Sequence, residues 1–175
     1  MRSYELDSLE LDSTLKTYLS DLDSAEITIK DITARQLLLH NSGLPSGLPI
    51  YQYYTYTDSV DTLRSVLYAS AKDSIPTVEV TGRLFHKASY MDSVWAKVRR
   101  VTLGNAGQYL YSDMSMFLLK TLLEEIHETS LDAFVQENFY DPLGLQTICY
   151  HPARRFDVNR IVPTEKDQWW RKQVL

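Results

Sequence analysis

Apolar residues recur at helix-type spacing along most of this chain, whereas strand-type alternation is confined to two triplets, Ile27-Thr28-Ile29 and Val78-Glu79-Val80. A helix can bury a stripe of residues spaced three and four apart, but two short strands cannot form an independent sheet. The sequence therefore predicts a mainly α-helical, one-domain assembly with long connections. Any substantial sheet is expected to lie outside these residues.

The apolar spacing predicts helices over residues 12–22, 33–40, 58–72, 92–101, 113–128 and 131–138. We expect Asp12 or Ser13 to cap the first helix, Thr33 the second and Ser130 the last, because their side chains can accept bonds from free first-turn amides. Gly43 is expected to end the second helix in a left-handed turn. Residues 43–57 are expected to form a loop of glycine and proline turns followed by tyrosines.

The composition is that of an ordinary globular protein, with 44% hydrophobic and 23% charged residues and a net charge of −5. No apolar run approaches the length of about 18 residues that a membrane span needs. We expect no nucleic-acid binding, because the basic pairs Arg99-Arg100 and Arg154-Arg155 are too short to form a phosphate-binding stripe. The first residues, Met1 to Glu5, do not have the pattern of a signal peptide.

The sequence supports no metal site and no cofactor. Cys149 is the only cysteine, which excludes a disulfide framework within the chain, and we expect it to be a small buried hydrophobe. The histidines show no pairing at helical spacing; they are His40, His86, His127 and His151. For His40 we expect a loop-fixing hydrogen bond rather than catalysis.

Four blocks occur in the order found in the serine β-lactamase-like family, which includes class C β-lactamases, penicillin-binding proteins and related esterases. The blocks that resemble it are Leu9-Glu10-Leu11-Asp12, the stretch Leu37-Leu38-Leu39-His40-Asn41-Ser42-Gly43-Leu44-Pro45, Tyr111-Ser112-Asp113, and Ser130-Leu131-Asp132 with Pro142-Leu143-Gly144-Leu145. The tail from Arg154 to Glu165 resembles the β-lactamase-like domains fused behind family 3 glycoside hydrolases in some bacterial cell-envelope proteins.

This resemblance implies that residues 1–175 are a partial domain, the helical lobe of an α+β serine β-lactamase/transpeptidase-like fold, with residues 45–106 as a variable insertion. The nucleophile of the family, on a Ser-x-x-Lys helix, would precede Met1, and its Lys/His-x-Gly strand would follow Leu175. The core sheet would be largely missing. The resemblance further implies an acyl or peptide-type small substrate and a parent protein in the bacterial cell envelope or periplasm.

Within the family pattern Tyr111 is the expected proton-transfer residue, and Asp113 the expected polar contact to substrate. A tyrosine simply packed at the start of a helix is the alternative for Tyr111, and a helix cap is the alternative for Asp113. The family usually has Asn where this sequence has Asp113, and a carboxylate can only accept hydrogen bonds where an amide also donates. Ser112 is expected to be a spacer or a cap.

Other chemistry-bearing patterns have simpler interpretations. Ser13-Thr14-Leu15-Lys16 matches Ser-x-x-Lys literally, but it lies where the family has no nucleophile. Glu124 and Glu125 point about 100° apart on a helix and cannot flank one glycosidic bond. The tyrosines of residues 51–56 and Trp169-Trp170 could stack on a sugar or peptide, although packing is the simpler expectation.

Two hypotheses follow. The first is a piece of a serine hydrolase of the β-lactamase and penicillin-binding-protein type, which would be inert by itself because it lacks the nucleophile. The second is a non-catalytic binding module on a degenerate scaffold. In either case, helices that have lost their covering sheet would expose apolar surface, so we expect self-association.

Overall fold

The computed structural model describes residues 1–22, 24, 26–48, 68–69, 77–81, 84–87 and 89–162. The chain divides into two compact units, Met1–Ile126 and His127–Leu175, which are described separately. The predictions for the tyrosines of residues 51–56, for Trp169-Trp170 and for most of the helix at 58–72 lie outside the described residues. Among the described residues, no helix is long and apolar enough to cross a bilayer.

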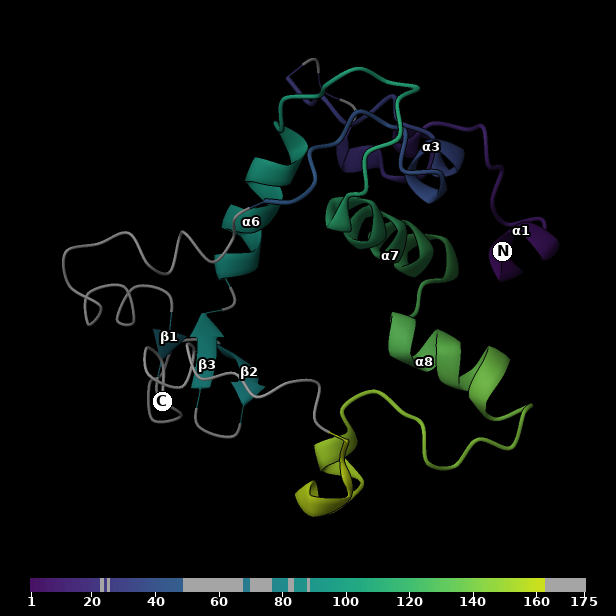
Figure 1. Ribbon diagram of the computed structural model, residues 1–175, viewed down its shortest axis with the longest axis vertical. Helices are drawn as coiled ribbons and strands as arrows, with labels where there is room; N and C mark the ends of the chain where they lie inside the picture. The colour runs from purple at the N-terminus through teal and green to yellow at the C-terminus, as the bar shows by residue number, and fades with distance from the viewer. Residues whose placement is uncertain are drawn as a thin grey trace. The chain divides into compact units, whose positions relative to one another are not determined.

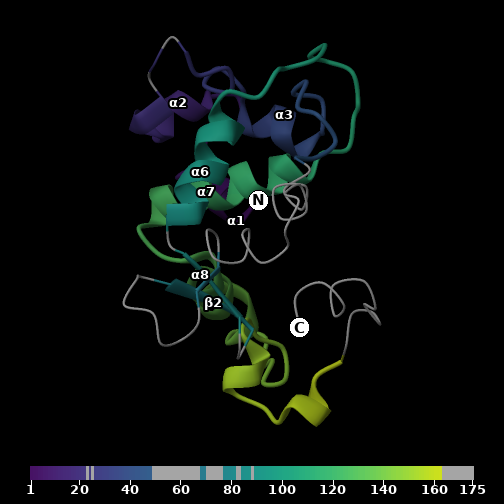
Figure 2. The ribbon, with the colours of Figure 1, turned by 90° about the vertical axis from the view of Figure 1, so that its left-hand side faces the viewer.

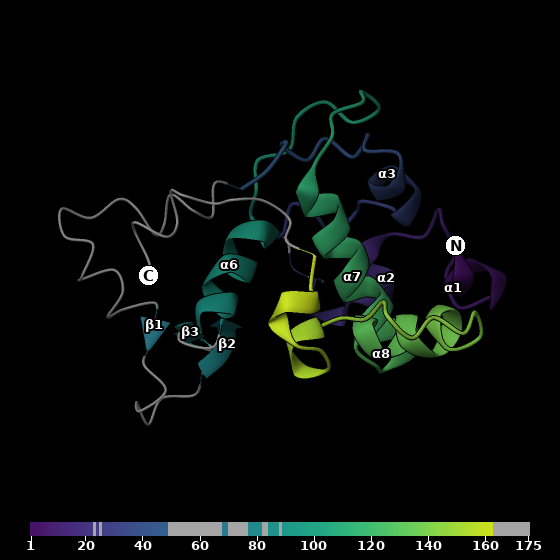
Figure 3. The ribbon, with the colours of Figure 1, turned by 60° about the horizontal axis from the view of Figure 1, so that its bottom comes forward.

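The first unit is a helical assembly around one buried core. Its helical elements are α1 (Arg2–Glu5), α2 (Leu15–Tyr18), the 3-10 turn η1 (Ser20–Leu22), α3 (Ala34–Leu38), α6 (Ser89–Arg99) and α7 (Asp113–His127). Figures 1 and 3 show α7 between α6 and α3. The largest fully buried apolar side chains of the core come from the amino-terminal segments and from α7; they are Leu15, Leu22, Ile29, Leu37, Leu44, Met114, Leu118 and Leu122.

Helix α7 is the longest described helix, and its bounds agree with the predicted helix to within one residue. Met114, Leu118 and Leu122 follow one another at intervals of four and are at most 2% exposed, so they form the stripe that faces the core. On the solvated side Lys120 pairs with Glu124 one turn later. The backbone of Glu128 then turns left-handed, with φ 50°, and the helix ends.

The predicted helix over residues 12–22 is shorter than expected. The amides of Leu15 and Lys16 donate to the carbonyls of Ile32 and Lys30, at 2.8 and 3.1 Å, and not to a cap at Asp12 or Ser13. Pairing with this neighbouring segment leaves only α2 and η1 as helical turns. The predicted buried face nevertheless survives, because Leu15, Leu19 and Leu22 are all buried.

Asp12 has a different role from the predicted cap. Its carboxylate accepts two bonds from the Arg35 guanidinium of α3, at 2.6 and 2.8 Å. The hydrogen bond to Arg35, followed by the charge of Arg35, lowers the pKa of Asp12 below its ordinary value although partial desolvation opposes this shift. The pair is exposed, so it fixes the register of the two segments more than it stabilises the fold.

Helix α3 begins as predicted and ends differently. The Thr33 hydroxyl accepts from the Gln36 amide and the Gln36 side chain accepts from the Thr33 amide, which is a capping box. At the other end the left-handed residue that ends the helix is His40, with φ 51°. Gly43 is also left-handed, but it lies beyond the end of the helix. The amide of His40 donates to Leu37, and the amide of Asn41 donates to the Gln36 carbonyl, the Schellman pattern of a helix end.

A short three-stranded antiparallel sheet lies within the expected variable insertion. Its strands are β1 (Tyr68–Ala69), β2 (Thr77–Thr81) and β3 (Leu84–Lys87), in the order β1-β3-β2. The strand predicted at Val78–Val80 is confirmed in β2. The helix predicted through residue 72 is wrong at residues 68–69, because the backbone there pairs with β3, with Tyr68 opposite His86. Local helical spacing carries no information about that distant partner.

The other predicted extended triplet, Ile27-Thr28-Ile29, forms no strand. Its backbone bends. The amide of Thr28 donates to the carbonyl of Arg99, the last residue of α6, at 3.0 Å, and its hydroxyl donates to the carbonyl of Val101 at 2.7 Å. Ile29 is fully buried. The alternation of apolar and polar residues here therefore serves to anchor α6 and fill the core.

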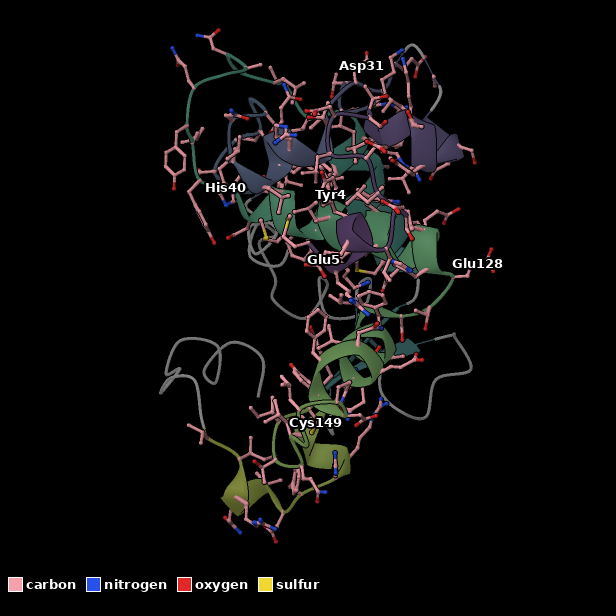
Figure 4. The ribbon with its side chains drawn as sticks, turned by 90° about the vertical axis from the view of Figure 1, so that its right-hand side faces the viewer. Tyr4, Glu5, Asp31, His40, Glu128 and Cys149 are labelled. Carbon is pink, nitrogen blue, oxygen red and sulfur yellow. The ribbon has the colours of Figure 1, made fainter. Side chains whose placement is uncertain are left out.

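The second unit carries α8 (Leu131–Val135), which continues as a π-helical turn, η2 (Gln136–Tyr140), and two 3-10 turns, η3 (Pro152–Arg154) and η4 (Val158–Arg160). Ser130 occupies the N-cap position as predicted, but its hydroxyl bonds the Asp132 carboxyl, which lowers the pKa of Asp132. The helical run ends before Pro142. Cys149, labelled in Figure 4, is half-buried and not the fully buried residue that we expected.

Candidate functional site

Backbone hydrogen bonds join two segments of the first unit that are about 65 residues apart in sequence. The segment after α3 supplies carbonyl acceptors, and the connection from α6 into α7 supplies donors; Figures 1 and 2 show this connection running past α3 before it enters α7. The bonds are Leu110 N to His40 O at 2.8 Å, Gly107 N to Asn41 O at 2.7 Å, Gly104 N to Gly43 O at 2.7 Å and Asp113 N to Ser46 O at 3.3 Å. We call this set of contacts the junction.

The junction requires a glycine at position 43. The backbone of Gly43 has φ 82°, which an L side chain rarely adopts. A β-carbon built there would lie 2.7 Å from the carbonyl oxygen of Gly104, closer than van der Waals contact allows. Only a residue without a side chain permits the two backbones to approach this closely.

Ser112 is a tether between the two segments. It is buried, its hydroxyl donates to the Pro45 carbonyl at 2.6 Å and its amide donates to Nδ1 of His40 at 3.3 Å. The hydroxyl is thus engaged with the junction and makes no cap bond to the first turn of α7. The prediction of a loop-fixing hydrogen bond for His40 is confirmed.

Tyr111 lies at the entrance to α7 with its side chain 54% exposed. Its ring stacks at a tilt of 43° on the imidazole of His40, with centroids 4.7 Å apart. The Asp113 carboxylate, as a hydrogen-bond acceptor and then through its charge, raises the pKa of Tyr111 above its ordinary value, and partial burial and nearby Tyr109 act in the same direction.

Asp113 is the first residue of α7 and is exposed. Its carboxylate stabilises the neutral phenol of Tyr111, since an ionised carboxylate can only accept and repels a phenolate. A tyrosine in this state holds its proton more strongly than a free phenol, and it becomes a base only when a cation offsets the charge of Asp113. The two candidate site residues of the sequence are therefore brought into direct contact, next to His40.

The rejected alternatives are also absent from the described geometry. Ser13 precedes Thr14, the N-cap of α2, so Ser13 and Lys16 do not share a helical turn, and the Lys16 ammonium pairs with Asp31 at 2.7 Å. Glu124 pairs with Lys120 on the solvated side of α7. No group of three or more histidine, cysteine or acidic side chains among the described residues could hold a metal ion.

The ring contact between His40 and Tyr111 is the feature that sequence reasoning missed. The sequence places His40 in one family-like block and Tyr111 in another, and nothing in the spacing of the blocks tells which side chains meet. His40 is labelled in Figure 4, beside the chain that leads into α7.

The sequence profile of the Beta-lactamase family matches residues 1–173, and the chain belongs to this family. A curated protein of Salmonella paratyphi B, named "Putative D-alanyl-D-alanine carboxypeptidase", is 27% identical over 107 residues, which are 61% of this chain and 25% of that protein. The chain thus spans about a quarter of the length of this relative.

Three of the solved structures with a similar fold come from different organisms. A D-stereospecific amidohydrolase from Streptomyces sp. has a TM-score of 0.54 and 16% identity, covering 82% of this chain and 38% of that chain. The octameric penicillin-binding protein homologue from Pyrococcus abyssi has a TM-score of 0.51 and 18% identity, with 82% and 28% covered. A class C β-lactamase from Rhodobacter sphaeroides has a TM-score of 0.50 and 21% identity, with 82% and 30% covered.

Proposed function

We propose that this chain is part of a serine hydrolase of the β-lactamase and penicillin-binding-protein type, whose complete form transfers an acyl group through a serine ester. The observation that carries the proposal is the meeting of two family-like blocks at the junction, which places Tyr111 against His40 at the start of α7. The family membership of the chain and the name of its Salmonella relative support it.

In the proposed mechanism a serine from outside these residues attacks an acyl carbon. Tyr111 takes the proton of that serine and returns it to the leaving group, and water then hydrolyses the serine ester. A neighbouring lysine of the Ser-x-x-Lys helix would offset the charge of Asp113 and lower the pKa of the phenol. Asp113 would accept a hydrogen bond from an N–H or a cationic group of the substrate, which favours acyl or peptide-type substrates with such donors. No cofactor enters this chemistry.

The proposal includes the position of the chain within its parent. The nucleophile helix would precede residue 1, and the Lys/His-x-Gly strand and most of the core sheet would lie outside residues 1–175. This arrangement is in accord with the chain spanning a quarter of its relative. By the same family resemblance, the parent would work in the bacterial cell envelope or periplasm.

The isolated chain is expected to be inert. A fluorescent penicillin and a chromogenic ester should neither label nor turn over on the 175-residue chain, because the nucleophile of the proposed hydrolase would lie before residue 1. A longer protein with the Ser-x-x-Lys helix should form a covalent adduct. Labelling of the short chain that disappears in Ser13→Ala would overturn the assignment of the nucleophile.

The second candidate function is a non-catalytic binding module. The observation that favours it is the raised pKa of Tyr111, because a phenol held neutral by a carboxylate is poorly suited to act as a base. The coding sequence upstream of residue 1 discriminates the two functions. A Ser-x-x-Lys helix encoded there would support the hydrolase. An upstream sequence without one would exclude the hydrolase and favour the binding module.

We expect the isolated chain to self-associate through apolar side chains near the site. Exposed residues of this kind occur on α3, on the connection and on α7; they are Leu38, Leu39, Tyr109, Leu110, Met116 and Phe117. Analytical ultracentrifugation should show a mass that rises with concentration, and Phe117→Ser should reduce this rise while Val158→Ser in the second unit does not. A single monomeric species at all concentrations would count against the proposed exposed face.

A further inference from the structure

His40 occupies the left-handed position at the end of α3, with φ 51°. Glycine is the least strained residue in this conformation, and asparagine, aspartate and histidine are tolerated better than other residues. The backbone therefore permits a histidine at position 40 without requiring one. The contacts of the imidazole indicate what the side chain does.

His40 holds the chain on both sides of Tyr111. Its carbonyl accepts from the Leu110 amide at 2.8 Å, and its Nδ1 accepts from the Ser112 amide at 3.3 Å. Because Nδ1 is the acceptor, the ring proton is on Nε2 and the imidazole is neutral. The residues immediately before and after Tyr111 are thus bound by one side chain and its own backbone.

The imidazole also contacts the tyrosine rings directly. It lies 4.7 Å from the ring of Tyr111 and 6.2 Å from that of Tyr109, the second in an edge-on arrangement of 86°. A ring wedged between two tyrosines limits the rotation of each of them. Tyr111 is 54% exposed, so few other contacts restrict its phenol.

We propose that His40 is a positioning residue for Tyr111: its two hydrogen bonds and its ring aim the phenol at the Asp113 carboxylate. The inference rests on the proposed function in so far as Tyr111 is the proton-transfer residue. The histidine of the Leu-Leu-x-His-x-Ser-Gly block would then orient the tyrosine of the site, in addition to joining two loops. Without the imidazole, the phenol would turn away from Asp113 and sample several directions.

The test follows the phenol itself in the 175-residue chain. Tyrosine labelled with carbon-13 at Cζ gives one signal per ring, and Tyr111→Phe identifies the signal of Tyr111. In the wild-type chain this signal should titrate above the ordinary pKa of tyrosine, because Asp113 stabilises the neutral phenol. His40→Asn and His40→Gly should move the pKa of Tyr111 back toward its ordinary value and leave the tyrosines remote from the junction unchanged.

Three further variants separate positioning from stability. His40→Phe keeps a ring but removes the acceptor, so it should give an intermediate shift. Thr33→Ala removes the capping box at the other end of α3 and should lower the melting temperature without moving the Tyr111 signal. Asp113→Asn should remove the largest part of the shift in the wild-type background and make the further effect of His40→Asn small.

The proposal is overturned when the His40 variants change the melting temperature but leave the titration of Tyr111 as in the wild type. The same holds when Thr33→Ala shifts that titration as much as His40→Asn, since the effect would then come from loosening of α3. Should His40→Gly fail to fold, His40→Asn, which tolerates the left-handed backbone, still gives the answer. Hydrolase activity does not enter this measurement, so failure of the proposed function leaves its result intact.

Discussion

Gly43→Ala is expected to destabilise the first unit by about 3 kcal/mol, from the cost of a left-handed side-chain residue plus the displacement of packed backbone. The added β-carbon would meet the Gly104 carbonyl oxygen at 2.7 Å, and that oxygen belongs to backbone that cannot rotate away. Such a loss is a large part of the stability of an ordinary domain. Urea unfolding followed by circular dichroism measures it as a lower midpoint at unchanged slope.

Two other glycines serve as matched controls. Gly107 lies in the same connection with φ 90°, but a β-carbon there meets nothing within 4 Å, so Gly107→Ala should cost only the backbone term of about 1 kcal/mol. Gly47 has neither restriction, and Gly47→Ala should be near neutral. Equal costs for Gly43→Ala and Gly107→Ala would contradict a close approach at the junction.

The parts of the fold that sequence predicted are those that local chemistry determines. Helix α7 follows from apolar residues at intervals of four, and the start of α3 follows from Thr33 and Gln36, which bond each other across one turn. Both interactions are made between neighbours in the chain. A sequence pattern is enough to predict such elements.

The parts that sequence missed depend on distant partners. The predicted helix at residues 12–22 loses its first turn because Leu15 and Lys16 bond the segment at residues 30–32. Residues 68–69 leave their predicted helix to pair with β3. In both places the hydrogen bonds of another segment outweigh an intrinsic helical preference that differs among ordinary residues by less than about 1 kcal/mol each.

The sequence predicts which residues form the candidate site, but it does not predict how their side chains contact one another. Tyr111 and Asp113 were predicted from resemblance, and their contact arises because Tyr111 precedes the first turn of α7, where two residues apart can still meet. His40 was expected to bond a loop but not to stack on Tyr111. That contact is produced by the junction, whose central glycine was expected to act as a helix end.

Tyr111→Phe is expected to lower kcat/KM of a longer protein that carries the nucleophile by roughly 10²- to 10⁴-fold, the usual contribution of one positioned proton-transfer group. The substitution removes the hydroxyl and keeps the ring that stacks on His40. The loss should appear mainly in kcat, because the proton moves in the transition state. Tyr109→Phe is the matched control, since Tyr109 contacts the ring of His40 edge-on but is not the proposed proton-transfer residue, and this variant should retain activity.

Asp113→Asn then distinguishes a base from a mere packing residue at position 111. The carboxylate raises the pKa of Tyr111, so replacing it by a neutral amide should lower that pKa and increase the ionised fraction at any pH below it. If Tyr111 accepts the proton of the nucleophile, kcat/KM rises with pH as the phenol ionises. This rise should occur at lower pH in Asp113→Asn and be absent in Tyr111→Phe. An unchanged profile in both variants would remove Tyr111 from the chemistry and leave it as the ring that closes the junction.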